Sequence, residues 1–119
     1  MALRILLVED DAEQAILYAN VLRTAGYDVV STESAERAIE QLATEAFHLA
    51  LVDWDLPGMT GDALICLLRT DYPAVKTLLF SNHTDVNQIA ETCGADAWLR
   101  KSEGILRLRT MVADLLKSS

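Results

Sequence analysis

Acidic side chains follow two apolar segments of this chain. Asp53 comes directly after residues 49–52, and Glu9 and Asp10 come directly after residues 5–8. A carboxylate can attack phosphorus and carry the phosphoryl group as an acyl phosphate, but its negative charge repels an anionic donor. A divalent cation reduces that repulsion, and Mg²⁺ takes carboxylate oxygens while it keeps waters and phosphate oxygens as ligands. Glu9 and Asp10, facing Asp53 across adjacent strand ends, would form part of such a cation site.

A hydroxyl and an amine follow two further apolar segments. Ser81 comes after residues 77–80, and Lys101 comes after residues 97–100. Lys101 would neutralise one phosphoryl oxygen and the Ser81 hydroxyl would donate to another, and positioning with charge stabilisation is most of what phosphoryl transfer requires. Either residue taken singly reads equally well as an exposed strand end. Together with the acidic residues, they predict a phosphoryl-transfer site.

The apolar segments predict strands that alternate with helices. Short, continuous apolar strands covered by amphipathic helices indicate a parallel sheet with right-handed crossovers and helices on both faces. The carboxyl ends of such strands meet along one edge, where ligands bind, so residues far apart in sequence converge there. Strands are expected near 5–8, 27–32, 49–52, 77–80 and 97–100, and helices near 12–25, 34–42, 61–72, 86–93 and after 102.

Capping residues mark three of these helices. Asp11, Ser34 and Ser102 each precede a predicted helix, where a side-chain oxygen can accept a hydrogen bond from a free backbone N–H. Asp11 is therefore assigned to the first helix rather than to the metal. Gly26 marks the end of that helix.

Composition limits the class of protein. The 119 residues, of which 51% are hydrophobic and 24% charged, predict one folded domain over residues 1–119. The formal net charge of −8 argues against direct binding of nucleic acid. The apolar runs are too short to span a membrane, and the N-terminus leaves no room for a signal peptide, so a cytoplasmic location is expected. Cys66 and Cys93 lack a pairing motif and are expected to be reduced, partly buried thiols.

The chain resembles a response-regulator receiver domain, the phosphoacceptor module of two-component signalling and phosphorelays, in its stand-alone, chemotaxis-receiver-like form. The matching stretches are residues 5–11 and 51–61 with Ser81 and Lys101, and the resemblance covers essentially the whole chain. It implies an α/β, flavodoxin-like, doubly wound fold: a five-stranded parallel sheet of order 2-1-3-4-5 with five helices.

The resemblance also implies roles for individual residues. Asp53 would be the phosphoacceptor, and Asp10 would bind Mg²⁺ or Mn²⁺ directly. Glu9 would complete the acidic pair, and the backbone carbonyl of Asp55 would be a third protein ligand. The remaining family positions are the hydroxyl switch, the aromatic switch and the site lysine, which correspond to Ser81, Trp98 and Lys101.

The family also implies partners. A histidine kinase or a phosphotransfer protein would supply the phosphoryl group, and a downstream protein target would bind the last strand and its flanking helices. A phosphorylation-dependent dimer is a further expectation. A receiver domain of this kind assists its own phosphorylation and dephosphorylation and is not classed as an enzyme.

Three residues depart from the family pattern or add to it. Family members commonly have proline after the site lysine, often with a cis bond, where this chain has Ser102. A trans bond is expected here, because a non-proline cis bond costs about 2.5–4 kcal/mol. Asn82 follows the switch serine where many relatives have a small residue, and Asp55 adds a negative side chain near the acceptor. The loop before the last helix and the rates of phosphorylation and dephosphorylation are expected to differ accordingly.

Two other functions compete with the receiver interpretation. Asp53 and Asp55 form an Asp-x-Asp signature, as in haloacid-dehalogenase-type phosphatases, but those enzymes carry their metal-binding acids C-terminal to the nucleophile and usually have a cap. A pseudo-receiver would keep the fold as a binding module without phosphotransfer. The complete set of acids, serine and lysine argues against it, although Ser102 and Asn82 leave it open.

Overall fold

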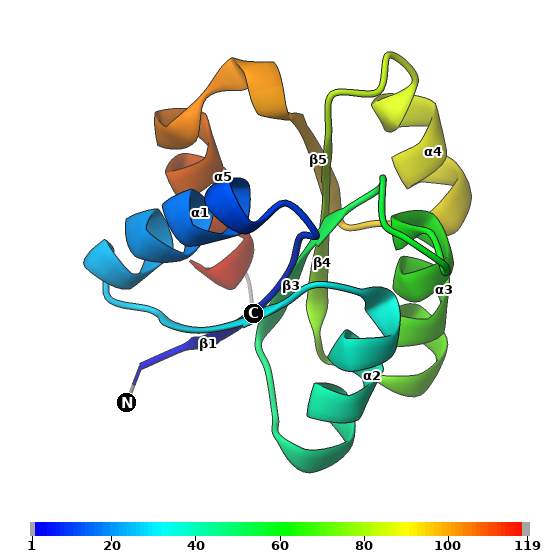
Figure 1. Ribbon diagram of the computed structural model, residues 1–119, viewed down its shortest axis with the longest axis horizontal. Coiled ribbons are helices and arrows are strands. Elements are labelled where there is room, and N and C mark those ends of the chain that lie inside the picture. Colours follow the sequence, from blue (N-terminus) through cyan, green and yellow to red (C-terminus); the bar gives the residue numbers. More distant parts are fainter. Residues whose placement is uncertain (1, 118–119) are drawn as a thin grey trace.

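Five parallel strands form the centre of the molecule (Figure 1). The structure is a computed structural model and describes residues 2–117. Within them the strand order is β2-β1-β3-β4-β5, which confirms the predicted flavodoxin-like topology. The strands are β1 (Arg4–Val8), β2 (Asp28–Thr32), β3 (Leu49–Asp53), β4 (Lys76–Ser81) and β5 (Ala97–Arg100).

Helices cover both faces of this sheet, as predicted (Figure 1). Side chains alternate along a strand, so Leu6 and Val8 pack on one face while Ile5 and Leu7 pack on the other. Every residue of β3, the central strand, is buried, which explains its continuous apolar sequence. One face packs α1 (Ala12–Thr24) and α5 (Ile105–Lys117), and the other packs α2 (Ala35–Thr44), α3 (Gly61–Asp71) and α4 (Val86–Cys93).

Two of the three predicted helix caps are confirmed. The Asp11 carboxylate accepts a hydrogen bond from the Gln14 backbone N–H at 3.1 Å, and the Ser34 hydroxyl accepts one from the Arg37 N–H at 3.1 Å. Each bond satisfies a backbone donor that the first helical turn leaves free. The first helix therefore begins directly after the acidic cluster, which holds Glu9 and Asp10 at the end of β1.

The predicted cap by Ser102 is wrong. Ser102 lies inside a short 3-10 helix, η1 (Lys101–Glu103), and α5 begins only at Ile105. The Glu103 carboxylate accepts from the Arg100 N–H at 3.0 Å, which closes this turn before α5 can start. Gly104 then redirects the chain with a φ of 95°, a region that favours glycine. The expected trans bond before Ser102 is present.

Gly61 allows α3 to begin directly beside the end of β3. A Cβ atom at this position would lie 2.2 Å from the Asp53 carbonyl oxygen and 2.8 Å from the Trp54 Cα, closer than atoms can approach. The Gly61 N–H donates to the Trp54 carbonyl at 3.0 Å. A backbone hydrogen bond thus closes the loop from β3 to α3 directly after Asp53.

The two cysteines are both free thiols in different environments. Cys93 is buried as expected, but Cys66 is exposed, because its helix position turns toward solvent rather than the core. Burial raises the pKa of the Cys93 thiol above its ordinary value. None of the helices within residues 2–117 has both the length and the apolar character that a membrane crossing requires.

Candidate functional site

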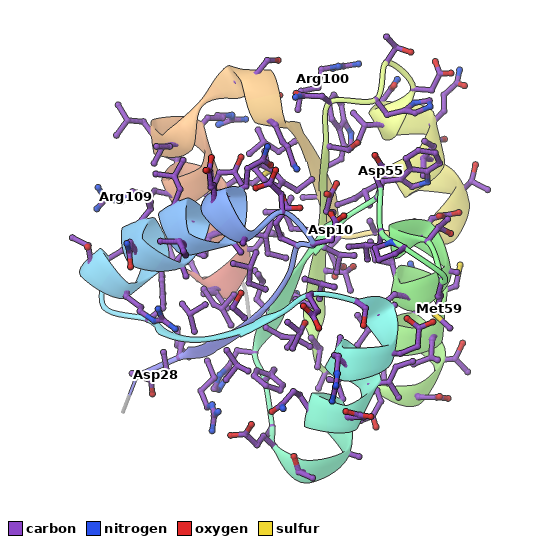
Figure 2. The ribbon with its side chains drawn as sticks, in the orientation of Figure 1. Asp10, Asp28, Asp55, Met59, Arg100 and Arg109 are labelled. Atoms are coloured by element: carbon purple, nitrogen blue, oxygen red, sulfur yellow. The ribbon has the colours of Figure 1, made fainter. Side chains whose placement is uncertain are left out.

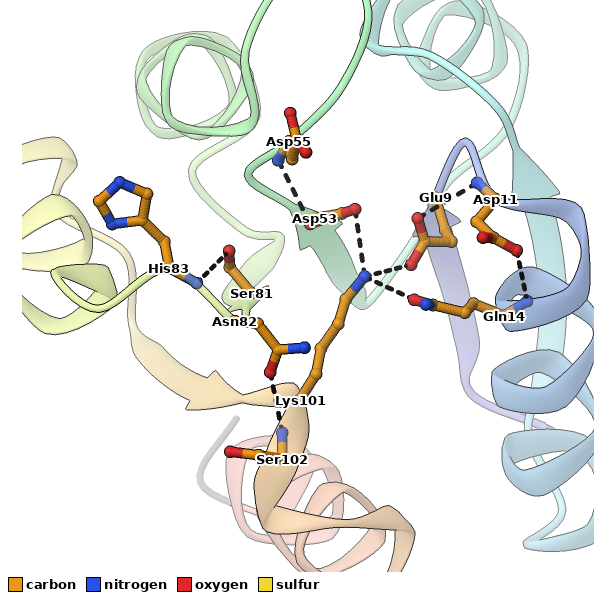
Figure 3. A network of polar contacts seen from close by, with 10 residues as sticks. All are labelled: Glu9, Asp11, Gln14, Asp53, Asp55, Ser81, Asn82, His83, Lys101 and Ser102. Atoms are coloured by element: carbon orange, nitrogen blue, oxygen red, sulfur yellow. Dashed lines mark hydrogen bonds and ion pairs between the residues drawn. The ribbon is translucent and has the colours of Figure 1, made fainter.

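The carboxyl ends of four adjacent strands bring the predicted polar residues together, and Asp53, Ser81 and Lys101 line one pocket there (Figure 3). Asp53 and Ser81 are the last residues of β3 and β4, while Glu9 and Lys101 directly follow β1 and β5. The pocket is open and has a volume of about 280 Å³. Its lining residues are Gln14, Asp53, Trp54, Asp55, Ser81, Asn82, His83 and Lys101.

Lys101 stands at the centre of the site. Its Nζ donates to Glu9 Oε1 at 2.6 Å, to Gln14 Oε1 at 2.7 Å and to Asp53 Oδ2 at 3.2 Å (Figure 3). These three bonds use all three donors of an ammonium group. The ammonium also lies 5.4 Å from the centre of the Phe80 ring. The side chains of Glu9, Asp53 and Lys101 are 2%, 6% and 12% exposed, so the pair interactions are shielded from water.

Burial and charge shift the pKa values in this cluster. Burial raises the pKa of Glu9, and the Lys101 hydrogen bond only partly opposes that rise. Burial alone would lower the pKa of Lys101, but its hydrogen bond to Glu9 and the charge of Asp53 raise it above the ordinary value. The lysine therefore remains a cation at neutral pH.

Three carboxylates gather beside the lysine. One oxygen each from Glu9, Asp10 and Asp53 lies within 4.8 Å of the others. Asp10 is exposed, and burial together with the charges of Glu9 and Asp55 raises its pKa. Figure 2 shows Asp10 and Asp55 near each other at this end of the sheet, whereas Asp28, the first residue of β2, lies at the opposite end.

This donor set fits a hard divalent cation. Three carboxylates face a single lysine, which leaves excess negative charge, and all the ligand atoms are oxygens, as Mg²⁺ prefers. Glu9 already accepts from Lys101 and, at 3.3 Å, from the Asp11 N–H. Asp10, which is exposed, and Asp53 are therefore the residues best placed to bind a cation directly.

The second oxygen of the Asp53 carboxylate is also held. Asp53 Oδ1 accepts from the Asp55 backbone N–H at 3.2 Å, which orients the carboxylate between the loop and Lys101. Asp55 is exposed and lines the pocket. That the Asp55 carbonyl binds the metal stays a prediction.

The two predicted switch residues occupy different places. Ser81 is buried at 3% exposure, lines the pocket, and its Oγ accepts from the His83 N–H at 3.0 Å. Trp98 does not line the pocket. It is 36% exposed on β5, and the Arg100 guanidinium lies 5.0 Å from the centre of its ring. In this structure the indole therefore faces outward.

The sequence analysis did not identify Gln14 and His83 as site residues. Gln14 lies in the first turn of α1, where its side chain reaches back to Lys101 at the strand end. His83 packs against Trp54 with ring centres 4.7 Å apart, and its Nδ1 accepts from the Asp85 N–H at 3.0 Å. One feature of the sequence could have indicated Gln14: it lies three residues after the Asp11 cap, and thus in the first turn of the helix that follows the acidic cluster.

The two departures from the family pattern contact each other. Asn82 Oδ1 accepts from the Ser102 backbone N–H at 3.0 Å (Figure 3). This bond joins the loop after Ser81 to the turn that contains Lys101. Asn82 and Ser102 are thus one structural feature rather than two.

The chain belongs to the response regulator receiver domain family, whose family model matches residues 5–113. It is therefore a receiver domain of two-component signalling systems. Both the family and the fold predicted from the sequence are confirmed.

Known proteins support this assignment. The response regulator protein FleR of Pseudomonas aeruginosa is 37% identical over 115 residues, which cover 95% of this chain and 24% of that protein. The sensor protein TorS of Escherichia coli is 38% identical over 82 residues, 68% of this chain and 9% of that protein. The chain thus spans a quarter or less of these two relatives.

Solved structures agree with the fold. A CheY-like response regulator receiver domain protein from Methanospirillum hungatei superposes with a TM-score of 0.93 at 26% identity. The match covers 99% of this chain and 96% of that one. The likeness therefore extends over the whole receiver domain, including the strand ends that form the pocket.

Proposed function

We propose that Asp53 accepts a phosphoryl group from a histidine kinase or a phosphotransfer protein, with Mg²⁺ or Mn²⁺ bound by Asp10, Asp53, Glu9 and the Asp55 carbonyl. One observation carries this proposal. Lys101 donates both to Asp53 and to Glu9 inside a largely buried cluster with an excess of negative charge. Buried unbalanced charge is costly, so such a cluster is expected where function requires it.

Asp53 and Lys101 have different roles in phosphoryl transfer. A carboxylate oxygen of Asp53 forms the new bond to phosphorus as the bond from phosphorus to the donor nitrogen breaks, and the electron pair of that bond stays on the nitrogen. Lys101 exchanges its long contact with Asp53 for one with a phosphoryl oxygen. Bound metal would supply further positive charge to the phosphoryl oxygens. Hydrolysis of the acyl phosphate by water returns the free carboxylate.

Phosphorylation would shift an equilibrium between two arrangements. The Ser81 hydroxyl, which now accepts from the His83 N–H, would turn toward the phosphoryl oxygens, and Trp98 would repack inward behind it. A ligand shifts populations only through a difference in interaction between the states, and here the difference is the hydroxyl contact. The large indole makes the inward state crowded.

The proposed output surface is β5 with α4 and α5. Trp98 of β5 is 36% exposed and Leu106 of α5 is 76% exposed, so these elements offer apolar side chains to a protein target. A phosphorylation-dependent dimer would use the same face. The proposal also includes a cytoplasmic location, and the domain acts as a signalling module that labels itself rather than as an enzyme.

Incubation with acetyl phosphate and Mg²⁺ tests the proposal. Intact mass should show a single added phosphoryl group in the wild type and none in Asp53→Asn, which keeps the shape of the side chain but removes the nucleophile. Turnover of added phosphomonoesters would instead indicate a phosphatase, and the absence of both reactions would indicate a pseudo-receiver. Full labelling of Asp53→Asn would refute the assignment of the acceptor.

Metal binding has a separate reporter in Trp54. The indole neighbours the acceptor and lines the pocket, so Mg²⁺ should change its emission. Asp10→Ala should remove the change. An unaltered titration in Asp10→Ala would place the metal elsewhere.

A further inference from the structure

Gln14 accepts one of the three hydrogen bonds that the site lysine donates. Its Oε1 accepts from Lys101 Nζ at 2.7 Å, almost as close as the charged Glu9. The Gln14 backbone is fixed as well, because its N–H donates to the Asp11 cap at 3.1 Å. Gln14 therefore reaches Lys101 from a rigid point at the start of α1 (Figure 3).

We propose that Gln14 is a positioning residue that aims Lys101 at the phosphoryl group, a role that rests on the proposed function. An ammonium group has three donors in a tetrahedral arrangement. When Glu9 and Gln14 hold two of them, the direction of the third is set, and in the structure it points at Asp53 Oδ2.

The lengths of the three bonds indicate which one is exchanged. The contact with Asp53 is 3.2 Å, against 2.6 Å and 2.7 Å for Glu9 and Gln14. A phosphoryl oxygen on Asp53 can take the donor of this longest bond while the two shorter ones remain. Lys101 then needs little movement between the free and the phosphorylated protein, and such preorganisation is what makes electrostatic stabilisation effective.

The neutral amide suits this role. Glu9 and Asp53 already place two negative charges beside Lys101, and an anionic donor must enter the same pocket. An amide oxygen accepts a hydrogen bond from the ammonium without adding a further negative charge beside Lys101 that would repel the anionic phosphoryl donor. The wild type should therefore be labelled fastest. A variant without an acceptor, Gln14→Met, and a variant with a carboxylate, Gln14→Glu, should both be labelled more slowly.

Labelling with acetyl phosphate tests the role of Gln14. Gln14→Met keeps the length of the side chain but removes the strong acceptor, and the loss of a hydrogen bond to a charged group should slow labelling about tenfold. The Mg²⁺ affinity should stay within about twofold of the wild type, since Gln14 offers no carboxylate to the cation. Asn20→Met removes an exposed amide from the same helix without touching the site, and should label like the wild type.

The position of Lys101 can be observed without phosphorylation. The chain has three lysines, Lys76, Lys101 and Lys117, so ¹³C labelling at Cε gives few signals, and Lys101→Arg identifies the relevant one. The Phe80 ring lies 5.4 Å from the ammonium, so a displaced lysine changes its chemical shift. Gln14→Met should move this signal, Gln14→Glu should move it less, and Asn20→Met should leave it unchanged.

The outcomes separate the two proposals. An unmoved Lys101 signal in Gln14→Met would show that Gln14 does not hold the lysine, and equal labelling of Gln14→Met and wild type would overturn the positioning role. A wild type that cannot be labelled would overturn the proposed function itself. A general loss of folding in Gln14→Met would lower its Mg²⁺ affinity too, which distinguishes structural damage from mispositioning.

Discussion

The two ends of the sheet carry ion pairs of opposite design. At the amino end, Arg4 pairs with Glu45 at 2.6 Å, and each side chain is 33% exposed. At the carboxyl end, Lys101 faces several carboxylates, and its partners Glu9 and Asp53 are almost fully buried. In the first pair the two charges cancel and both side chains remain partly accessible to water. In the second group the negative charges outnumber the positive charge and the side chains are shielded from water. An exposed pair adds little stability, and a buried unbalanced cluster reduces it, so only the carboxyl end indicates a binding function.

Removal of Lys101 should have the largest effect. Lys101→Met leaves Glu9 and Asp53 buried without a counter-charge, which should lower the free energy of unfolding by about 3 kcal/mol in the absence of metal. The rate of labelling by acetyl phosphate should fall about 100-fold, because a donor to the phosphoryl oxygens is lost. Urea titration and timed intact-mass measurements check these values. A labelling rate equal to that of the wild type would exclude Lys101 from the reaction.

The same lysine predicts a loss of stability in alkali. Because the pKa of Lys101 is raised in the folded protein, its contribution to stability is fully present below the ordinary value of 10.5. It is lost as the pH rises through the folded value. Urea midpoints above pH 10 should therefore fall more steeply in the wild type than in Lys101→Met, and parallel curves would contradict the assignment.

The hydroxyl of Ser81 should control the next largest effect. Beryllofluoride, which stands for the phosphoryl group on Asp53, should change chemical shifts at Trp98 and along β5 in the wild type. Ser81→Ala should reduce that response, because the variant loses the coupling between the phosphoryl group and β5. Such a coupling free energy is typically about 1–3 kcal/mol. Ser81→Thr retains the hydroxyl and serves as the matched control. Equal responses in Ser81→Ala and wild type would make Lys101 the next candidate for the coupling element.

A smaller effect of the opposite sign is expected at Asp10. Without metal, Asp10→Asn removes repulsion from Glu9 and should stabilise the protein by about 1 kcal/mol, the energy of two charges about 4 Å apart in water. Added Mg²⁺ should raise the melting temperature of the wild type but not of the variant. A variant less stable than the wild type in metal-free buffer would contradict this account.

The Asp10 carboxyl group should also make the stability of the metal-free protein depend on pH. The pKa of Asp10 is raised on folding, so the folded chain binds the proton more tightly than the unfolded chain does. The contribution of Asp10 to stability should therefore fall as the pH rises from the ordinary value of 3.8 through the folded value. Asp10→Asn should flatten this part of the curve, as measured by urea unfolding across the acid range.

The balanced pair at the amino end should matter least. Glu45→Gln breaks the contact with Arg4 and should cost about 0.5 kcal/mol, a usual value for a pair that remains accessible to water. Labelling of Asp53 should be unchanged, because this pair lies at the other end of the sheet. A change in the labelling rate would show that the two ends are coupled.

The sequence predicted the sheet and the convergence at its carboxyl edge for a simple reason. Parallel strands that end in polar residues place those residues together whatever the loops do, so Glu9, Asp53, Ser81 and Lys101 could be grouped without coordinates. The Asp11 cap was equally local, since it depends on only three following residues.

Other features depended on tertiary placement. Gln14 could not be assigned, because its contact with Lys101 requires the direction of α1 relative to β5, 87 residues away in the chain. The cap by Ser102 was wrong because the Glu103 side chain closes the turn on Arg100 instead. The exposure of Cys66 also depended on tertiary placement, because its thiol meets the Cys93 carbonyl at the end of α4 and still lies at the surface.

The hydrogen bond from the Ser102 N–H to Asn82 has a consequence for sequence variation. Proline at position 102 would have no N–H to donate, and the Asn82 amide would lose its partner. A small residue at position 82 would leave the N–H of Ser102 without an acceptor. In an alignment of homologues, asparagine at 82 should therefore occur together with a non-proline residue at 102, and proline at 102 with a small residue at 82. Positions 82 and 102 would then co-vary, because a change at either one removes the hydrogen bond that joins the two loops.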